Sequence, residues 1–250
     1  VNQQQLDHWG ARFGDLLPVA IDNLADQPNG GWQAIDNRVW ISRSGDDYDG
    51  ARMLIPGFLD ETGLAGELVV IHPNRNHLVV AAVDDVDGIR TACELALEDI
   101  DAPSPISFQP LVGRDRDWRP LVLPPSHPAY APWRRLTCLA NELNHRSLHQ
   151  SLQQLIGEDL YIPRYLLAEG ADGLVSSYTT WTEGVPSLLP RTDYIGLVTE
   201  QGEAVTAPWN TVHRMVGTMM EPTDHFPELW RVLSFPDNAG ISRLRNLSSS

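Results

Sequence analysis

Proline is concentrated in one part of this chain. Eight of the nineteen prolines fall within residues 103–132, PSPISFQPLVGRDRDWRPLVLPPSHPAYAP. Proline has no backbone N–H and a fixed φ, so it interrupts helices and is excluded from the interior of a hydrogen-bonded sheet. We therefore expect 103–132 to form an extended crossover with at most one short strand. The crossover would divide the chain into an N-terminal half at 1–102, a C-terminal half at 133–240 and a flexible tail at 241–250.

Each half contains the pattern of a β-hairpin followed by a helix. The β-branched runs LVVI and LVVAAV flank the turn residues PNRN within 67–83, and a helical pattern with an aspartate cap continues to residue 100. The same order recurs at 193–220, where a hairpin through EQGE precedes the helical stretch WNTVHRMVGTMM. The sequence predicts an α+β fold of two small mixed halves and leaves open whether they are a duplication.

The remaining periodicity is mostly helical. Apolar residues at spacings of three and four predict an amphipathic helix over 4–25, bent or divided at Pro18. A second helix is expected at 46–61, entered through acidic residues. A third is expected over 131–157, with a bend or break near 144–148, where its apolar stripe changes direction. Paired strands are expected on either side of GADG.

The charge balance excludes one large class of partners. The chain has 18 Lys and Arg against 33 Asp and Glu, a formal net charge of −15, and its densest basic stretches, 114–119 and 133–135, are short. Nucleic-acid binding depends on clustered basic residues that neutralise phosphates, so we expect none. An acidic surface suits attraction to a basic protein partner, although it also serves solubility alone.

Membrane insertion and export are not expected either. No stretch approaches the roughly 18 apolar residues of a membrane helix, and residues 1–10 lack the regions of a signal peptide. The sequence predicts a cytoplasmic protein, and its first residue, Val rather than Met, leaves open whether an upstream segment was removed. The two cysteines, Cys93 and Cys138, stand in apolar helical contexts where free thiols pack as small hydrophobes, so a disulfide is not implied.

Motifs of common enzymes are missing from the sequence. The chain has no GxSxG, GxxxxGK[ST], HExxH or CxxC pattern. The acidic clusters DDYDG and DDVDG suggest calcium loops, which require a ligand at their first position. With Gly50 at the sixth position, that first position is Gly45, and with Gly88 it is Val83. We therefore expect both clusters to begin helices, and we expect no cofactor.

Two histidines and an arginine stand at the turn of the first hairpin. If PNRN forms a four-residue turn, His72 and His77 face each other across the strand ends, with Cβ atoms roughly 5 Å apart. Such a pair could bind a transition metal if a third ligand came from elsewhere. We interpret the two histidines as polar strand ends and expect no metal. Arg75 at the tip is a candidate binding residue, because an exposed guanidinium can make bidentate contact with a carboxylate.

The stretch ELNHRSLH carries another arrangement of metal-ligand residues. Glu142, His145 and His149 are spaced by three and four residues, which places them on one face of a helix. Glu-x-x-His on a helix occurs in carboxylate-bridged metal sites. The apolar stripes of this helix place His145 at the edge of a buried surface and Glu142 in water, so we favour solvated or capping roles.

The loop WTEGVPSLLPRTD, residues 181–193, sets three charges within apolar sequence. Glu183, Arg191 and Asp193 are separated by two prolines that stiffen the loop. One interpretation is a structural ion pair between Arg191 and either carboxylate. The other is a binding loop with a polar centre. These three residues join Arg75 as the candidate binding residues.

Three stretches together resemble a known family: DDYDGARMLIPGFL, the hairpin with HPNRNHLVV, and SYTTWTEGVPSLLPRTDYIGLV. Their order is similar to that of the YtpQ-like bacterial proteins over about residues 45–235, in which a helix precedes a strand–PNR–strand hairpin and a later strand pair precedes a closing helix. That family has no established activity. The resemblance therefore implies an α+β fold and a bacterial cytoplasmic protein, and it assigns no catalytic residue.

Two hypotheses of function remain. The first is a non-enzymatic, protein-binding module of the inhibitor or immunity type, supported by the net charge, the missing motifs and eight tryptophans that could include exposed anchors. The second is a hydrolase-like or metal-dependent enzyme whose site is assembled from distant residues: His72, His77, Glu183 and Asp193. We favour the first. A deep pocket with converging ionisable groups would argue for the second.

Overall fold

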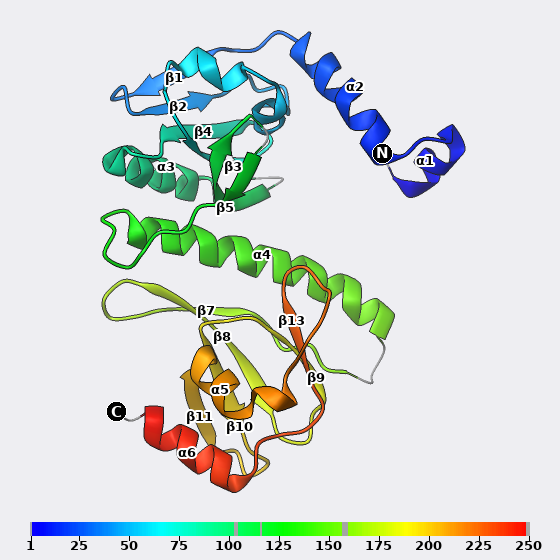
Figure 1. Cartoon of the computed structure of the whole chain (residues 1–250), viewed down its shortest axis with the longest axis vertical. Coiled ribbons are helices and arrows are strands. Elements are labelled where there is room, and N and C mark those ends of the chain that lie inside the picture. The colour runs from blue at the N-terminus through cyan, green and yellow to red at the C-terminus, as the bar shows by residue number, and fades with distance from the viewer. Residues whose placement is uncertain (1, 103–104, 116, 157–159, 249–250) are drawn as a thin grey trace. The chain divides into compact units, whose positions relative to one another are not determined.

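The chain folds into two compact units, Val1–Thr137 and Cys138–Ser250, which are described separately. Their boundary falls inside one long helix, α4 (Tyr130–Ile156). The expected division at the proline-rich segment is therefore not where the chain divides. The computed structural model, drawn in Figure 1, describes residues 2–102, 105–115, 117–156 and 160–248.

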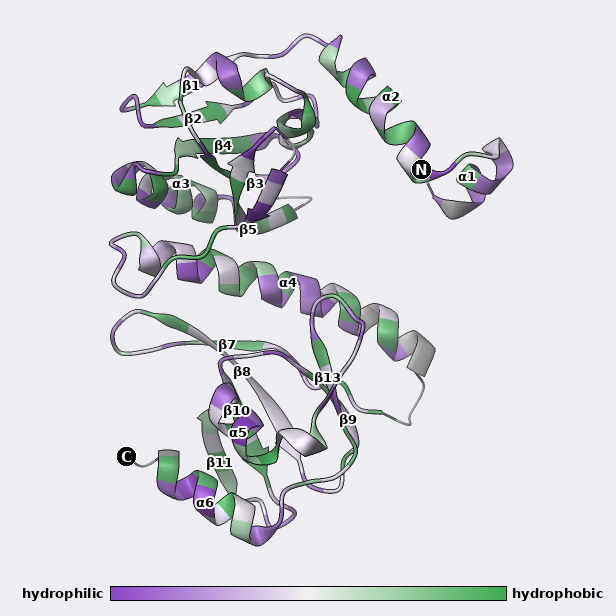
Figure 2. Cartoon of the chain, viewed as in Figure 1, coloured by the Kyte–Doolittle hydropathy of each residue, from purple (hydrophilic) through white to green (hydrophobic). Residues whose placement is uncertain are grey.

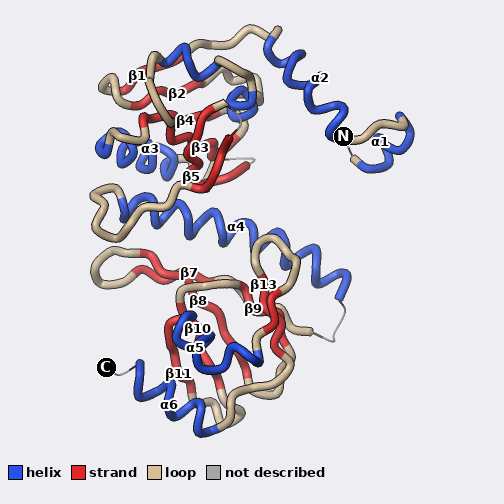
Figure 3. The backbone as a smooth tube through the Cα atoms, viewed as in Figure 1, coloured by secondary structure: helices blue, strands red, loops and turns tan. Residues whose placement is uncertain are grey.

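The first unit is built on a six-stranded antiparallel sheet. Its strand order is β1-β2-β4-β3-β5-β6, and Figure 3 draws its strands in red with α3 beside β3 and β4. The predicted hairpin with a following helix is present as β3, β4 and α3. The strands are β1 (Trp32–Ile35), β2 (Val39–Ser42), β3 (Leu68–Asn74), β4 (His77–Ala82), β5 (Pro105–Arg114) and β6 (Asp117–Pro120). The helices are α1 (Gln3–Trp9), α2 (Phe13–Ala25), the 3-10 helices η1 (Gly50–Leu54) and η2 (Phe58–Thr62), and α3 (Val86–Glu98).

Both faces of the two central strands, β3 and β4, are buried. Alternate residues of each strand point to opposite sides of the sheet, so each face has its own set of packing partners. Val70 and Val80 belong to a cluster with Met53 and Phe58 from the 3-10 helices. The alternate residues of β3 and β4 face α3, whose buried side is apolar. Figure 2 shows hydrophobic and hydrophilic residues alternating along α3. The continuous β-branched runs of the sequence are thus explained by a sheet covered on both sides.

The proline-rich segment does not form a crossover, and this expectation was wrong. It supplies β5, which pairs with β3 inside the sheet, and β6, which pairs with β5. Pro105 is the first residue of its strand and Pro120 the last of an edge strand. Pro110 lies where the register between β3 and β5 shifts. None of these positions needs the missing N–H, so the prolines are compatible with the ladder.

The helices before β3 also differ from expectation. The N-terminal helix is divided at Gly10, whose φ of 62° ends α1, while Pro18 lies inside an uninterrupted α2. The segment 46–61 forms two short 3-10 helices on either side of Pro56 rather than one α-helix. The cap of α3 was predicted correctly, because the Asp85 side chain accepts a hydrogen bond from the Gly88 amide at 3.0 Å.

The second unit combines two small sheets with the C-terminal part of α4. One sheet has the order β11-β10-β8-β7, in which β8 and β10 run parallel, and the other has the order β12-β13-β9. The strand pair around GADG and the hairpin with a helix were predicted correctly. The strands are β7 (Leu166–Glu169), β8 (Val175–Thr182), β9 (Ser187–Pro190), β10 (Tyr194–Val198), β11 (Ala204–Pro208), β12 (Glu221–Pro222) and β13 (Leu229–Val232). The helices are α5 (Trp209–Val216), the 3-10 helix η3 (Gly217–Met219) and α6 (Asn238–Ser248).

Two expectations about this unit were wrong. The long helix α4 continues without a break through 144–148. The expected tail at 241–250 is instead part of α6 as far as residue 248, and the last two residues lie outside the described part of the chain. Ile241 and Leu244 of α6 are buried in the core beside Trp181 and Leu197, and this burial fixes the C-terminal helix.

Each unit contains one free, buried cysteine. Cys93 lies on the sheet side of α3, and burial raises the pKa of its thiol to about 12. Cys138 lies on α4 and donates a weak hydrogen bond to the Val175 carbonyl at 3.8 Å. Both thiols therefore pack as small hydrophobic groups, as the sequence predicted.

Candidate functional site

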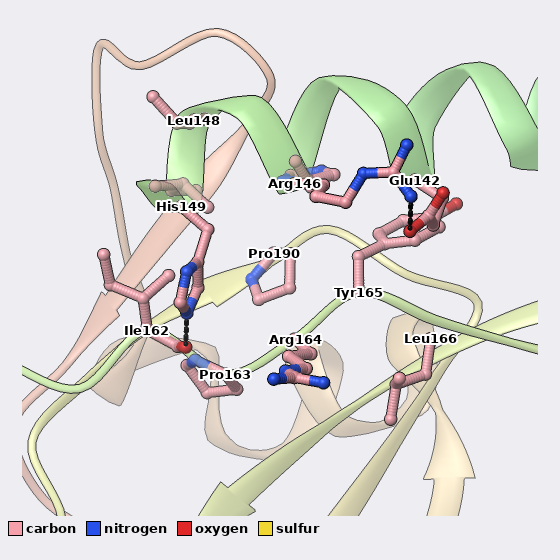
Figure 4. A pocket seen from close by; sticks show the side chains of 12 residues that line it. Glu142, Arg146, Leu148, His149, Ile162, Pro163, Arg164, Tyr165, Leu166 and Pro190 are labelled. Carbon is pink, nitrogen blue, oxygen red and sulfur yellow. Dashed lines mark hydrogen bonds and ion pairs between the residues drawn. The ribbon is translucent and has the colours of Figure 1, made fainter. Parts of the chain in front are cut away.

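A pocket of about 410 Å³ opens in the second unit between α4 and the segment that leads into β7. Figure 4 shows Arg146 and His149 on the helix, with Arg164 and Tyr165 on the chain opposite. Its polar lining residues are Glu142, His145, Arg146, His149, Arg164 and Tyr165, and its apolar ones are Leu148, Ile162, Pro163, Leu166, Pro190 and Leu229.

The helical face predicted from the sequence forms one side of this pocket. Glu142, His145 and His149 are spaced by three and four residues, so the continuous α4 directs all three toward the same space. The His149 ring contacts the Ile162 carbonyl through Nε2 at 3.1 Å, as Figure 4 shows. Glu142 is half-buried and forms an ion pair with Arg146 at 3.5 Å. The face thus belongs to a pocket that the sequence did not predict.

His145 is one of two buried ionisable groups of the pocket, and Tyr165 is the other. Its ring stacks on Tyr165, with ring centroids 4.9 Å apart and planes 13° apart. Burial lowers the pKa of His145 to about 4, because the charged imidazolium loses its hydration. The ring is therefore neutral at neutral pH and serves as a flat, apolar wall.

Tyr165 links the pocket to one of the predicted binding residues. Burial raises the pKa of its phenol to about 12, and the nearby side chains of Ser177 and Asn141 offset part of this rise. The Ser177 amide and hydroxyl both donate to Oδ2 of Asp193, each at 2.7 Å. Asp193 therefore holds β8 behind the pocket wall and does not line the pocket.

The other charged residues of the 181–193 loop lie apart from the pocket. Glu183 accepts a hydrogen bond from the Glu200 amide at 2.9 Å. Arg191 donates to the Thr192 carbonyl at 2.6 Å and to Asn210 at 2.9 Å. Its guanidinium also lies over the Trp209 ring, 4.7 Å from the centroid. Of the two carboxylates considered as partners of Arg191, Glu183 instead holds the loop that follows β10.

One of the charges that act on Arg191 belongs to the same loop, and the other lies just before β13. Burial lowers the pKa of Arg191, and the carboxylates of Glu228 and Asp193 counteract this by favouring the charged form. The guanidinium is thus half-buried and held at the start of α5. This supports a structural role for Arg191.

In the first unit, the predicted facing of His72 and His77 is wrong. The turn contains two residues, Arg75 and Asn76, and His77 pairs with Asn74 while His72 pairs with Ser107 of β5. The four-residue turn fails because Pro73 lies within the irregular end of β3. Arg75 is exposed at the tip, as predicted.

The two histidines of the hairpin have separate environments. His77 is buried, and its Nδ1 contacts the Asp99 carboxylate while Nε2 accepts a hydrogen bond from Arg43 at 3.3 Å. Nε2 is therefore the acceptor, which places the proton on Nδ1. His72 Nδ1 is buried without a hydrogen-bond partner among the described residues, and burial lowers the pKa of His72.

Neither unit brings metal ligands together in its described part. Across the residues that the structure describes, no three His, Cys, Asp or Glu side chains are close enough to hold a metal ion. In the same residues, no helix is both long enough and apolar enough to cross a membrane.

Sequence reasoning missed the two arginines and the tyrosine of the pocket. Arg146 lies one residue after His145, and Arg164 and Tyr165 follow IP in a stretch interpreted only as a strand. Their shared location depends on the contact between α4 and 162–166, which no local pattern encodes. The one available signal was the polar face of α4.

Among known proteins, the chain is similar to a UPF0354 protein, lin1649, of Listeria innocua, with 25% identity over 134 residues. The aligned region covers 49% of this chain and 48% of the relative, so the chain spans about half the length of the curated relative it matches. The name of that protein states no activity. No family model matches the chain, and no solved structure matches it. The similarity supports a distant relationship to an uncharacterised bacterial family.

Proposed function

We propose that this chain is an acidic, non-enzymatic protein-binding module of the inhibitor or immunity type that engages a basic protein. The observation that carries the proposal is the outer face of α3. Asp87, Glu94 and Glu98 are exposed there at spacings of seven and four residues, which aligns them along one side of the helix. Asp84 and Asp101 extend the acidic surface at the two ends.

Two carboxylates at the centre and end of this surface are not neutralised by the residues that the structure describes. Asp87 is paired with Arg90 at 2.7 Å and with Arg38 at 3.9 Å, whereas Glu94 and Glu98 have no ion pair within the described residues. The exposed apolar side chains of Val86 and Ile100 accompany the carboxylates. A surface that mixes charge with apolar groups suits a protein partner, whose association complementary charge would accelerate.

The structure offers fewer exposed tryptophans as binding anchors than the sequence suggested. Seven of the eight are buried or half-buried, and Trp9 is exposed on α1. All eight lie in the described ranges. The proposal therefore rests on charge and not on tryptophan anchors.

The alternative enzyme has weaker support. His72 and His77 belong to the first unit, and Glu183 and Asp193 belong to the second. His77 contacts Asp99, Glu183 the Glu200 amide and Asp193 Ser177, while His72 Nδ1 has no hydrogen-bond partner in the described residues, so neither unit assembles these side chains as a cluster. The one feature that favours an enzyme is the pocket beside α4, whose described lining has no serine, cysteine or lysine nucleophile.

We further propose that the chain is a distant member of the YtpQ-like bacterial proteins. The motifs around its first hairpin and the 181–193 loop support this, together with the similarity to the Listeria protein. The resemblance carries no activity, so it is compatible with a binding protein.

The proposal is tested by capture of partners from a lysate of the source bacterium. The double variant Glu94→Gln, Glu98→Gln removes two charges from the α3 face. The control Asp22→Asn, Asp26→Asn removes two charges from exposed positions in the last turn and at the C-cap of α2. We expect the wild type and the control to retain one basic protein at low salt and release it at high salt, because screening shortens the electrostatic field to about 8 Å near physiological ionic strength. The α3 variant should not retain it.

Two results would contradict the proposal. Recovery of no basic protein at either salt concentration would contradict the proposal that the chain binds a basic partner. Equal loss of the partner from both double variants would show a dependence on net charge alone and would remove the α3 face as the binding surface.

A further inference from the structure

We propose that the pocket beside α4 binds a small organic monoanion, a carboxylate carried on an apolar body. This site is distinct from the α3 face, since every residue of the pocket belongs to the second unit. The proposal rests on the charge of the lining, the state of its two arginines and its apolar walls.

The described lining of the pocket is positive in an otherwise negative unit. The second unit as a whole has 13 Asp and Glu against 7 Arg. The lining carries Arg146 and Arg164 against one carboxylate, Glu142. With both histidines of the lining counted as neutral, the charges of Arg146, Arg164 and Glu142 sum to about one positive charge at neutral pH. A monoanion would neutralise this excess, whereas a cation would meet two guanidinium groups.

Both arginines are able to accept a ligand. Arg164 is exposed and has no hydrogen bond or ion pair within the described residues. Arg146 makes only a long contact with Glu142, at 3.5 Å. Guanidinium groups bind carboxylates through two parallel N–H donors, a stronger arrangement than a single long contact. Figure 4 shows the two side chains on opposite sides of the pocket, one on α4 and one on the chain below it.

The rest of the lining suits an apolar body. Leu148, Ile162, Leu166 and Leu229 line the pocket, and the His145–Tyr165 stack adds a flat aromatic wall. A volume of about 410 Å³ lies within the usual range for small-molecule sites, which combine apolar walls with a few polar groups.

The walls are held in place before any ligand binds. Pro163 and Pro190 stiffen two lining segments, and the contact of His149 with the Ile162 carbonyl ties α4 to the opposite wall. The stacked His145 ring holds the Tyr165 ring against α4. A site that needs little ordering loses less free energy on binding.

The charge of Glu142 favours a carboxylate over a phosphate monoester. A phosphate monoester carries close to two negative charges at neutral pH, and Glu142 would repel the second. A carboxylate matches the single excess charge and the planar geometry of one guanidinium. The pocket is therefore assigned to monoanionic organic acids.

The test is calorimetric titration of the full chain with 2-naphthoate and octanoate, their neutral amides, and octyl phosphate. We expect a carboxylate to bind at least tenfold more tightly than its amide. Arg164→Gln should weaken carboxylate binding roughly 10- to 100-fold, because it removes a charged hydrogen-bond donor. Arg243→Gln, which removes an exposed arginine of α6, is the control and should leave the affinity unchanged.

Several outcomes would overturn the assignment. Absence of binding by both carboxylates at millimolar concentration would remove the site, as would equal affinity for acid and amide. An unchanged affinity in Arg164→Gln, with folding verified by thermal unfolding, would exclude that arginine as the anion ligand. Tighter binding of octyl phosphate than of octanoate would replace the carboxylate with a phosphate monoester. None of these results depends on the proposed protein partner.

Discussion

The imidazole of His145 stacks on the phenol of Tyr165, with ring centroids 4.9 Å apart and planes inclined by 13°. Both rings are buried, and burial moves the two pKa values in opposite directions, to about 4 for His145 and about 12 for Tyr165. In each case the neutral form is favoured, since hydration of the charged form is lost. The stack therefore presents an uncharged wall across the whole neutral range.

The first prediction concerns the pH dependence of stability. The folded pKa of His145 lies below its unfolded value of about 6.5, so between about pH 6.5 and 4 the unfolded state binds a proton that the folded state does not. Stability from this residue is complete above pH 6.5 and falls as the pH drops to 4. In His145→Phe this loss, about 2–3 kcal/mol, should be absent.

Urea unfolding of both proteins at pH 7, 5.5 and 4 provides the measurement. As the pH falls, the free energy of unfolding of the wild type should decrease relative to that of His145→Phe. A difference that stays constant with pH would show that His145 binds its proton equally well in the folded and unfolded states.

The second prediction concerns the Asp193 carboxylate behind the pocket wall. Asp193→Ala would remove the acceptor for the Ser177 amide and hydroxyl, at a cost of about 1–3 kcal/mol. Asp193→Asn keeps one oxygen acceptor and should lose less. Thermal unfolding of the two variants gives the comparison, and equal losses would mean that the negative charge matters more than the acceptor.

The third prediction concerns Arg52, which is 1% exposed in the first unit. It donates to Asp46 at 2.9 and 2.6 Å and to the Pro28 carbonyl at 3.0 Å, and it lies 3.6 Å from the buried Asp49. Arg52→Met would leave the buried carboxylate of Asp49 and the partly exposed one of Asp46 without their guanidinium partner, and we expect a loss of about 3–5 kcal/mol. Arg119→Met, which breaks an exposed pair with Glu67, is the control and should change the urea midpoint little.

The fourth prediction concerns Gly113 in β5, whose φ is 155°. A Cβ added there would lie 1.9 Å from the Asp117 carbonyl oxygen, so β6 would have to move away. Gly113→Ala should destabilise the first unit by more than about 3 kcal/mol. Gly66→Ala has open space around the new methyl and a φ of 73°, so backbone strain of roughly 1–2 kcal/mol is expected. Thermal midpoints that fall equally in both variants would contradict the steric argument.

The sequence predicted those elements whose causes are local. The two hairpins, the Asp85 cap and the strand pair around GADG follow from β-branched runs, turn residues and capping chemistry within a few positions. The strand β5 could not be predicted in this way. Its prolines are tolerated because Pro110 lies opposite an irregularity of β3, while its carbonyl accepts a hydrogen bond from Leu121 at 2.9 Å.

The candidate site could be predicted only in part for the same reason. The polar face of α4 follows from spacing, because residues three and four apart share a helical face. Arg164 and Tyr165 reach that face through tertiary packing about twenty residues along the chain. The sequence identifies the charged residues of the 181–193 loop as candidates. Their hydrogen bonds to Ser177 and Glu200 depend on strand pairing, which residue type alone does not specify.

The two buried thiols, one in each unit, allow local opening of each unit to be measured by chemical modification without introducing a label. A cysteine reacts with an alkylating reagent only as an accessible thiolate, so modification must wait for the surrounding structure to open. Cys93 would report transient exposure of α3, and Cys138 would report separation of α4 from β8. Peptide mass spectrometry after timed alkylation of the wild-type protein would give an opening rate at each cysteine. Comparison of the two rates would show whether the two units open together or independently.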